Sequence, residues 1–361
     1  MIELIGTWLM SLDPGFDILR YLTVRTIGST LTALTLSILL GPLFIRYLTS
    51  IQFAQSIRSD GPKSHLAKSG TPTMGGLIII ISFVISTLLW SDFQNPYIWV
   101  LLFVTAAFSF VGFLDDWLKI RDNNSKGLNG RYKLGLQFAF SLITLALILR
   151  ISPDGSNQIF ILPFNKDFIF AISPILFAGI GIFVIMGASN AVNLTDGLDG
   201  LAILPTILIA AGLGLIAYAM GNQIIANYLF IPFHPFTGEL IVFCGALIGA
   251  GIGFLWYNTY PAEIFMGDLG SLTLGAVLGT LAVLLRHEVV FAIMAGVFVM
   301  ETLSVIIQVG SFKLRGNRVF LMAPIHHHFE LKGWAEPKII VRFWIITFVL
   351  VLFALATLKL R

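Results

Sequence analysis

Long apolar runs, separated by short polar connections, occur along the whole of this 361-residue chain. A helix needs about 20 apolar residues to cross a hydrocarbon layer about 30 Å thick. Ten runs approach or reach this length, although the fourth and eighth are short enough that the count could change by one. They comprise residues 27–48, 74–90, 97–114, 134–149, 168–186, 201–220, 240–256, 272–285, 289–309 and 339–358. The pattern predicts an all-α integral membrane protein, in which residues 1–361 form one polytopic domain of about ten transmembrane helices.

Composition supports this prediction, because 57% of the residues are hydrophobic and 11% are charged, against about 25% charged in soluble domains. The net charge of +3 is too small to indicate nucleic-acid binding. The single cysteine, Cys244, lies in the seventh run, cannot form an intramolecular disulfide and is interpreted as a packing residue. The first twenty residues contain Glu3, Asp13 and Asp17 and lack the basic start of a secretory signal, so we expect them to be retained.

The positive charges are distributed unevenly between alternate connections. One side receives fifteen of the twenty-two Lys and Arg residues. The positive-inside rule assigns that side to the cytoplasm. Because ten crossings return the chain to its starting side, both termini are expected on the opposite, periplasmic side.

Four polar segments fall on the predicted cytoplasmic face, where we expect a polar active-site cleft. They are "VGFLDDWLKIR" (111–121), "NAVNLTDGLDG" (190–200), "WYNTYPAEIFMGDLGS" (256–271) and "APIHHHFELKGW" (323–334). Asp115 and Asp116 follow the third run at its C-terminal end, where the helix dipole disfavours negative charge, so capping does not explain them. If that helix continues for another turn, Asp115 and Lys119 form an i, i+4 pair, which could equally be a surface ion pair.

Further acidic positions have both structural and functional interpretations. Asn193, Asp196 and Asp199 are spaced by three, which would align them along one side of a helix or helical turn. The "DGLDG" segment around them could also be a turn and the N-cap of the next helix. Asp268 precedes the eighth run, where it could cap the helix or lie beside an anion bound at the helix N-terminus.

Carboxylates gathered at one face require compensating charge, and hard oxygen ligands without a zinc pattern favour Mg²⁺. Lys119, Lys126, Arg131 and Lys133 occur in the same connections, as phosphate recognition would require. The consecutive histidines at 326–328 would diverge rather than converge on one zinc, so hydrogen bonding to an anionic substrate is the better interpretation.

Three other features are predicted from position alone. Glu301 lies within the ninth run and would be costly facing lipid, which indicates a polar cavity or a broken helix there. Gly245, Gly249 and Gly253 are spaced as a helix-packing seam. The role of His65, in a cytoplasmic connection, stays open.

A transporter would carry ionisable groups near the bilayer midplane and often inverted repeats, whereas these acids cluster at helix ends. A purely structural protein would have no use for polar clusters in four connections. The residues alone therefore favour Mg²⁺-dependent phosphoryl chemistry at the membrane surface.

Five motifs in order resemble those of the polyprenyl-phosphate N-acetylhexosamine-1-phosphate transferase superfamily. They are "GTPTMGG" (70–76), "FLDDWLK" (113–119), "NAVNLTDGLDGLA" (190–202), "FMGDLGS" (265–271) and "PIHHHFELKGW" (324–334). The resemblance extends over most of the chain, and the "HHHFE" block is similar to that of the phospho-N-acetylmuramoyl-pentapeptide transferase branch.

This resemblance implies a reaction and its participants. UDP-N-acetylmuramoyl-pentapeptide and undecaprenyl phosphate would give undecaprenyl-diphospho-N-acetylmuramoyl-pentapeptide and UMP, with Mg²⁺ as cofactor. It further implies a multi-pass enzyme of the bacterial cytoplasmic membrane that works at the cytoplasmic face and could form a homodimer. The alternatives are a sister enzyme that uses UDP-N-acetylglucosamine and, more remotely, a transporter.

The resemblance also assigns site residues by their match to the motifs. Asp115 and Asp116 match the aspartate pair, with Asp115 the candidate for contact with the lipid phosphate. Asp268 matches the Mg²⁺-associated aspartate, for which a covalent nucleophile is the competing role. The remaining matches are substrate-binding candidates: Asn193, Asp196 and Asp199 on the uridine and diphosphate side, His326, His327 and His328 in the histidine motif, and Lys68, Lys119, Lys126, Lys133 and Asn258 at further polar positions.

Overall fold

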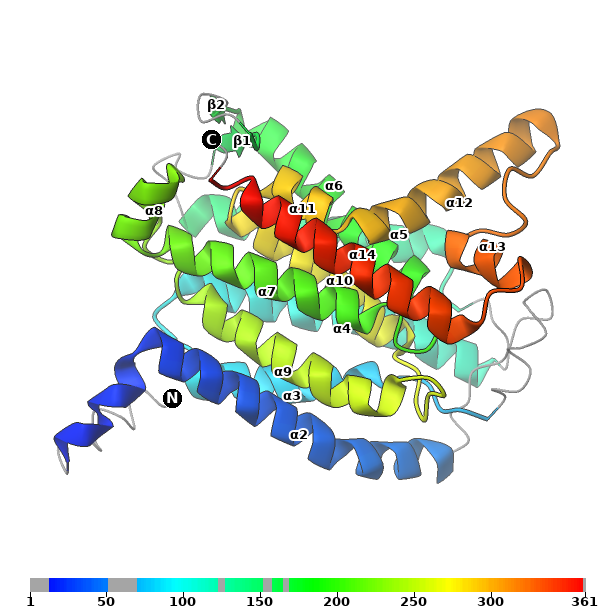
Figure 1. The fold of residues 1–361 in the computed structure, drawn as a ribbon, viewed down its shortest axis with the longest axis horizontal. Coiled ribbons are helices and arrows are strands. Elements are labelled where there is room, and N and C mark those ends of the chain that lie inside the picture. Colours follow the sequence, from blue (N-terminus) through cyan, green and yellow to red (C-terminus); the bar gives the residue numbers. More distant parts are fainter. Residues whose placement is uncertain (1–12, 51–69, 123–126, 152–157, 165–168, 360–361) are drawn as a thin grey trace.

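The computed structural model describes residues 13–50, 70–122, 127–151, 158–164 and 169–359. Nine helices in these ranges are long and apolar enough to cross a membrane, which confirms the predicted all-α, multi-pass architecture. They are α2 (Leu22–Ser50), α4 (Pro96–Arg121), α5 (Gly130–Ile151), α6 (Pro174–Thr195), α7 (Ile203–Met220), α9 (Leu240–Asn258), α10 (Gly267–Leu284), α12 (Gly296–Arg315) and α14 (Glu336–Ala356). Figure 1 shows them packed side by side as one bundle.

The remaining elements are short. In the described ranges, one 3-10 helix, four shorter α-helices and one antiparallel pair of strands connect or extend the long helices. They are η1 (Pro14–Arg20), α3 (Gly76–Trp90), α8 (Gln223–Leu229), α11 (Glu288–Met294), α13 (Ile325–Leu331), β1 (Ile159–Ile161) and β2 (Ile169–Ala171).

Each of the ten apolar runs contributes helix, but the run that falls short is the second, not the fourth or eighth. Helix α3 has 15 residues and so extends about 22 Å, less than the ~30 Å hydrocarbon layer. The chain before it is tied to the segment before α10: the Gly75 and Gly76 N–H groups donate to the Phe265 and Met266 carbonyls at 2.8 and 2.9 Å, and the Phe265 N–H donates to the Pro72 carbonyl at 2.9 Å. These bonds satisfy non-helical backbone that would otherwise be costly near the membrane.

The ninth run is broken into two helices. The backbone leaves helical geometry at Ala295 (φ −81°, ψ 14°), so α11 ends and α12 begins in a new direction. Helix α12 then leans away from the rest of the bundle (Figure 1), and only 22% of the residues in its apolar stretch are buried. The break agrees with the expectation raised by Glu301, which is fully buried in the second turn of α12.

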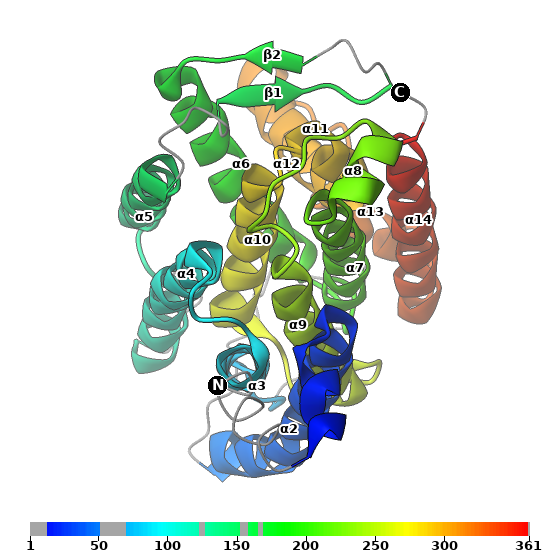
Figure 2. The same cartoon turned by 90° about the vertical axis from the view of Figure 1, so that its left-hand side faces the viewer.

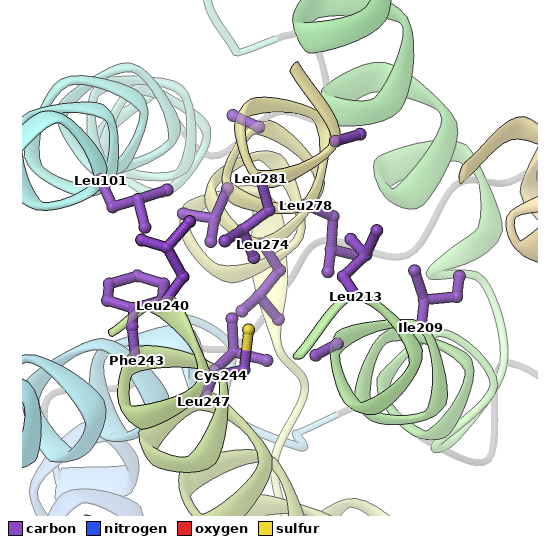
Figure 3. Close-up of a cluster of buried hydrophobic side chains, with 14 of the residues drawn as sticks. Leu101, Ile209, Leu213, Leu240, Phe243, Cys244, Leu247, Leu274, Leu278 and Leu281 are labelled. Carbon is purple, nitrogen blue, oxygen red and sulfur yellow. The ribbon is translucent and has the colours of Figure 1, made fainter. Parts of the chain in front are cut away.

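Helix α10 is the central helix of the bundle (Figure 2) and packs against α3, α4, α6 and α7. In its apolar stretch, 89% of the residues are buried. Burial on all sides suits a helix that is apolar on every face. Figure 3 shows its leucines interleaved with side chains of α4, α7 and α9. Cys244 is buried among them, as the packing interpretation predicted. The enclosed helix gives its first turn, which carries Asp268, a fixed position.

The predicted glycine seam packs α9 against α2. A side chain at Gly245 would meet the Thr30 hydroxyl, one at Gly249 would meet the Thr30 carbonyl, and one at Gly253 would meet Ser37. The seam is therefore a helix-packing surface, as expected for small residues at this spacing.

The polar segments gather at one end of the bundle. There α4, α6 and α9 end, and α5, α7, α10 and α14 begin (Figure 1). Helix η1 and the end of α14 lie at the opposite end. The described chain thus starts and finishes at the same end of the bundle, while the side of the membrane on which that end lies stays a prediction.

Candidate active site

Three carboxylates from two helices meet at this end of the bundle. Asp115 and Asp116 lie in the final two turns of α4, and Asp268 lies in the first turn of α10. One oxygen from each lies within 4.8 Å of the others. Asp115 and Asp116 are 2% and 3% exposed, so their charges require compensation inside the protein.

Two lysines supply that compensation. Lys119 Nζ lies 2.5 Å from Asp115 Oδ2, 2.9 Å from Asp268 Oδ2 and 3.5 Å from Asp116 Oδ1. Lys133, from the first turn of α5, lies 2.7 Å from Asp268 Oδ2 and 3.6 Å from Asp115 Oδ1. The i, i+4 pair expected from the sequence is formed, and it belongs to a network rather than to the surface. Three carboxylates and two ammonium groups leave one net negative charge.

Neutral donors complete the cluster. The Asn193 amide, from α6, donates to Asp268 Oδ1 at 2.8 Å and lies 2.9 Å from the Ser271 hydroxyl. The Leu269 N–H donates to Asp116 Oδ2 at 3.0 Å. Sequence reasoning did not single out Ser271, although its position three residues after Asp268, on the same face of α10, could have indicated it.

Glycines allow α4 and α10 to approach this closely. Gly267 adopts φ +75°, a conformation that favours glycine, immediately before Asp268. A Cβ on Gly112 of α4 would overlap the backbone of Asp268 and Leu269. The local backbone, and not only the charged side chains, therefore sets the position of the carboxylates.

The depth of the cluster follows from the length of α4. Asp115 comes nineteen residues after Pro96, the first residue of α4, which corresponds to about 29 Å along the helix axis. The helix continues for six more residues beyond Asp115, to Arg121.

Asp196 lies at the margin of the cluster, where it is the C-cap of α6. Burial, together with the negative charges of Asp268, Asp116 and Asp199, raises the pKa of Asp196 well above its usual value. Within the described ranges its carboxylate accepts no hydrogen bond, so nothing offsets this effect.

Asp199 and Asn258 organise neighbouring loops. Asp199 Oδ2 accepts a hydrogen bond from the Ala262 N–H at 3.0 Å, and the Asp199 N–H donates to Glu336 Oε1 at 3.2 Å. Helix α6 ends at Thr195, so the spacing of three does not continue as a helical face through Asp199. Asn258 accepts from the Gly200 N–H at 3.1 Å and its amide donates to the Ile264 carbonyl at 2.8 Å. These two candidates join the segments around the cluster.

The ring nitrogens of the three histidines have different partners and do not converge on one point, although the His326 and His327 rings pack against each other. His327 Nδ1 lies 2.6 Å from Glu330 Oε2. His328 Nδ1 accepts a hydrogen bond from the Leu321 N–H at 3.1 Å. Burial and the nearby positive charge of Lys332 lower the pKa of His328, which favours the neutral ring that this bond needs.

His326 is 1% exposed, and its ring packs against that of His327 with 4.1 Å between the ring centroids. Its Nδ1 is 3.1 Å from Glu301 Oε1 of α12. Its Nε2 lies against Gly197, where a side chain would collide with the ring. Lys68, Lys126 and His65 fall outside the described residues.

The cluster fits a metal ion by its donor set and its charge. Three hard carboxylate ligands within reach of one another, carrying one net negative charge after the lysines are counted, suit a hard divalent cation. Asp268, Asp115 and Asp116 are the residues that could hold it.

An apolar helical bundle with carboxylates and lysines at its helix ends defines a multi-pass membrane protein whose site suits phosphate chemistry. Residues 98–286, just over half of the chain, match the model of glycosyl transferase family 4, and the chain belongs to that family. Residues 68–80 match the phospho-N-acetylmuramoyl-pentapeptide-transferase signature 1, which supports a member of that type. Together these matches confirm the resemblance drawn from the motifs and support phosphoglycosyl transferase activity.

Proposed function

We propose that this protein transfers phospho-N-acetylmuramoyl-pentapeptide from its UDP conjugate to undecaprenyl phosphate, which gives undecaprenyl-diphospho-N-acetylmuramoyl-pentapeptide and UMP. The observation that carries the proposal is the cluster of Asp115, Asp116 and Asp268 around Lys119 and Lys133 at one end of an apolar bundle. The signature match at residues 68–80 supports the muramoyl-pentapeptide substrate.

The reaction balances as a substitution at phosphorus. A lipid phosphate oxygen forms a bond to the phosphorus that carries the sugar, the bond from that phosphorus to the UMP oxygen breaks, and the electron pair leaves with UMP. Such transfers need mainly positioning and charge stabilisation. Lys119 and Lys133 can neutralise phosphate oxygens, and Asp115 can accept a proton from, or orient, the lipid phosphate.

Mg²⁺ is the proposed cofactor, with Asp268 as its principal ligand and Asp115 and Asp116 nearby. When bound, it would neutralise and orient the diphosphate. The contacts of Asp268 support this role over that of a nucleophile, because one oxygen accepts from Asn193 and the other pairs with both lysines. A carboxylate so engaged is a weak nucleophile, which favours direct transfer in one step.

The test is Mg²⁺-dependent UMP release by purified protein with undecaprenyl phosphate. UDP-N-acetylmuramoyl-pentapeptide and UDP-N-acetylglucosamine are compared in parallel, each with and without Mg²⁺. We expect release with the muramoyl substrate only. Release with the glucosamine substrate only would move the protein to the sister branch, and release with neither would refute a transferase of this kind.

We further propose that the enzyme resides in the bacterial cytoplasmic membrane as a homodimer, with its active site toward the cytoplasm. Because Cys244 is buried in the core, a single new surface cysteine can be labelled with little background. Lys332→Cys, at the active-site end, should react with an impermeant maleimide only after cells are opened, whereas Gln223→Cys, at the opposite end, should react from outside. The reverse pattern would contradict the orientation, and crosslinking in the membrane checks the dimer.

A further inference from the structure

A carboxylate lies inside membrane-spanning helix α12, away from the aspartate cluster. Glu301 is fully buried, and ionisable groups in such helices are costly unless a partner compensates them. His326 Nδ1 lies 3.1 Å from Glu301 Oε1. The two atoms are at ion-pair distance without the alignment of a linear hydrogen bond, a geometry that often tightens only when substrate binds.

The opposite edge of the His326 ring contacts the backbone of the turn that carries Asp196. Its Nε2 packs against Gly197, where a Cβ would overlap the ring. Gly197 follows Asp196, whose carboxylate is repelled by the negative charges of Asp268 and Asp116. The ring therefore fills the space between α12 and the turn that carries Asp196.

His326 is too deeply buried to touch substrate in this conformation, so its effect must pass through that turn. The His327 ring packs against the His326 ring, while its Nδ1 lies beside Glu330 Oε2, and His328 Nδ1 accepts from the Leu321 N–H. His326 is the member of the triplet that contacts both Glu301 of α12 and Gly197 beside Asp196.

We propose that Glu301 is a positioning residue, which holds the His326 ring against the Asp196–Gly197 turn and thereby fixes Asp196 beside the aspartate cluster. The inference rests on the proposed transfer reaction, because transfer is its readout. A carboxylate that orients an imidazole acts through its charge and its hydrogen bond. Loss of such a partner from a metal-bound imidazole typically costs about 10- to 100-fold in metal affinity or activity, and we expect an effect of the same order here.

The test is a double-mutant cycle on purified protein. Glu301→Gln keeps the side-chain shape and removes the charge. We expect kcat for UMP release to fall about 10- to 100-fold, while KM for the UDP substrate changes little, because Asp196 is displaced rather than lost. His326→Asn should cause a similar loss, and the double variant should be no worse than either single one, because both act through one contact.

Ser304→Ala is the matched control in the same helix. Ser304 is buried one turn further along α12 and donates to the Glu301 carbonyl oxygen, so its loss perturbs α12 without touching the His326 ring. Its kcat should equal that of the wild type.

Two outcomes would overturn the inference while leaving the transfer reaction intact: wild-type kcat in Glu301→Gln, or losses that multiply in the double variant. If Glu301→Gln does not fold, Gly197→Ala tests the opposite edge of the ring with Glu301 intact. It should lower kcat with little change in KM, and wild-type kcat would overturn the inference. An inactive wild-type protein would instead refute the proposed function.

Discussion

Replacement of Asp268 by Asn is the most direct test of the cluster, because Asp268 is its most connected carboxylate. One oxygen accepts from Asn193 at 2.8 Å, and the other lies 2.7 Å from Lys133 and 2.9 Å from Lys119. The substitution keeps the side-chain shape and removes one negative charge. The net charge of the three acids and two lysines then changes from −1 to zero, which weakens the attraction for a divalent cation.

The expected loss of stability is moderate, because neither lysine loses all compensation. Asp115 still lies 2.5 Å from Lys119 and 3.6 Å from Lys133. The free energy of unfolding should fall by about 2 kcal/mol, the scale of one hydrogen bond to a charged group, rather than the ~3–5 kcal/mol of an abandoned buried charge. The protein should therefore remain folded and inserted.

The expected loss of activity is much larger. Removing one group that stabilises developing charge typically lowers kcat about 10²- to 10³-fold, or roughly 3–4 kcal/mol of barrier. We would measure UMP release across a Mg²⁺ titration, with thermal unfolding in detergent measured on the same samples. The Mg²⁺ concentration at half-maximal rate should rise as well.

Asp122→Asn is the matched control, since Asp122 follows the end of α4 and pairs with Arg121 in an exposed position. It should retain wild-type turnover and Mg²⁺ dependence. Turnover of Asp268→Asn above one tenth of the wild-type value at the same Mg²⁺ concentration would refute the central role given to Asp268.

Three further predictions concern the same end of the bundle. Lys119→Gln should bind Mn²⁺ several-fold more tightly, as measured by electron paramagnetic resonance, because the lysine competes with a cation for the same carboxylates. Its turnover should fall at least about 100-fold, because the lysine also stabilises charge in the proposed reaction. Weaker Mn²⁺ binding would contradict this. The raised pKa of Asp196 means that its contribution to stability is fully present below its unfolded value near 3.8 and is lost as the pH rises through the folded value. Melting temperatures of wild type and Asp196→Asn should therefore diverge in favour of the variant between pH 4 and 8, and parallel curves would count against the shift. Gly112→Ala should lower the free energy of unfolding by about 1–3 kcal/mol and should also lower turnover, because its methyl group would push α10 away from α4. Gly135→Ala on α5, where nothing lies within 4 Å, should change neither. Equal behaviour of the two variants would show that the close approach is unimportant.

Much of the fold could be predicted because membrane-spanning helices are recognisable in a sequence by their length and apolar composition. The apolar runs within α5 and α10 are short, yet α5 gains a turn at its start from polar residues such as Lys133 that face the cluster. Helix α3 falls short because its apolar run includes Met74, which adopts φ +69° in the segment before the helix. Hydropathy cannot detect either effect, since both depend on tertiary contacts. The short α8 and α13 carry no such signal at all.

The candidate site divides in the same way. The pair of Asp115 and Lys119 follows from helical spacing alone, and the adjacency of the histidines explains why their ring nitrogens have different partners. The contact of Lys133 with Asp268 joins residues 135 positions apart, which no local pattern encodes. The cost of a carboxylate in a membrane helix distinguishes Glu301 in the sequence, but only the fold shows that its partner is His326.

The depth of Asp115 along α4 has an energetic consequence for a substrate with a polyprenyl tail. For a helix that crosses near the membrane normal, about 29 Å from Pro96 brings Asp115 to the far edge of a ~30 Å hydrocarbon layer. A lipid phosphate at that edge already lies level with the carboxylates. A site at Arg121, about 9 Å further out, would require part of the tail to be drawn into water, at a cost of roughly 0.8 kcal/mol for each methylene exposed. Because Asp115 lies below the end of α4, the proposed lipid substrate would reach the carboxylates without leaving the hydrocarbon layer, and the proposed water-soluble substrate would have to enter from the aqueous side.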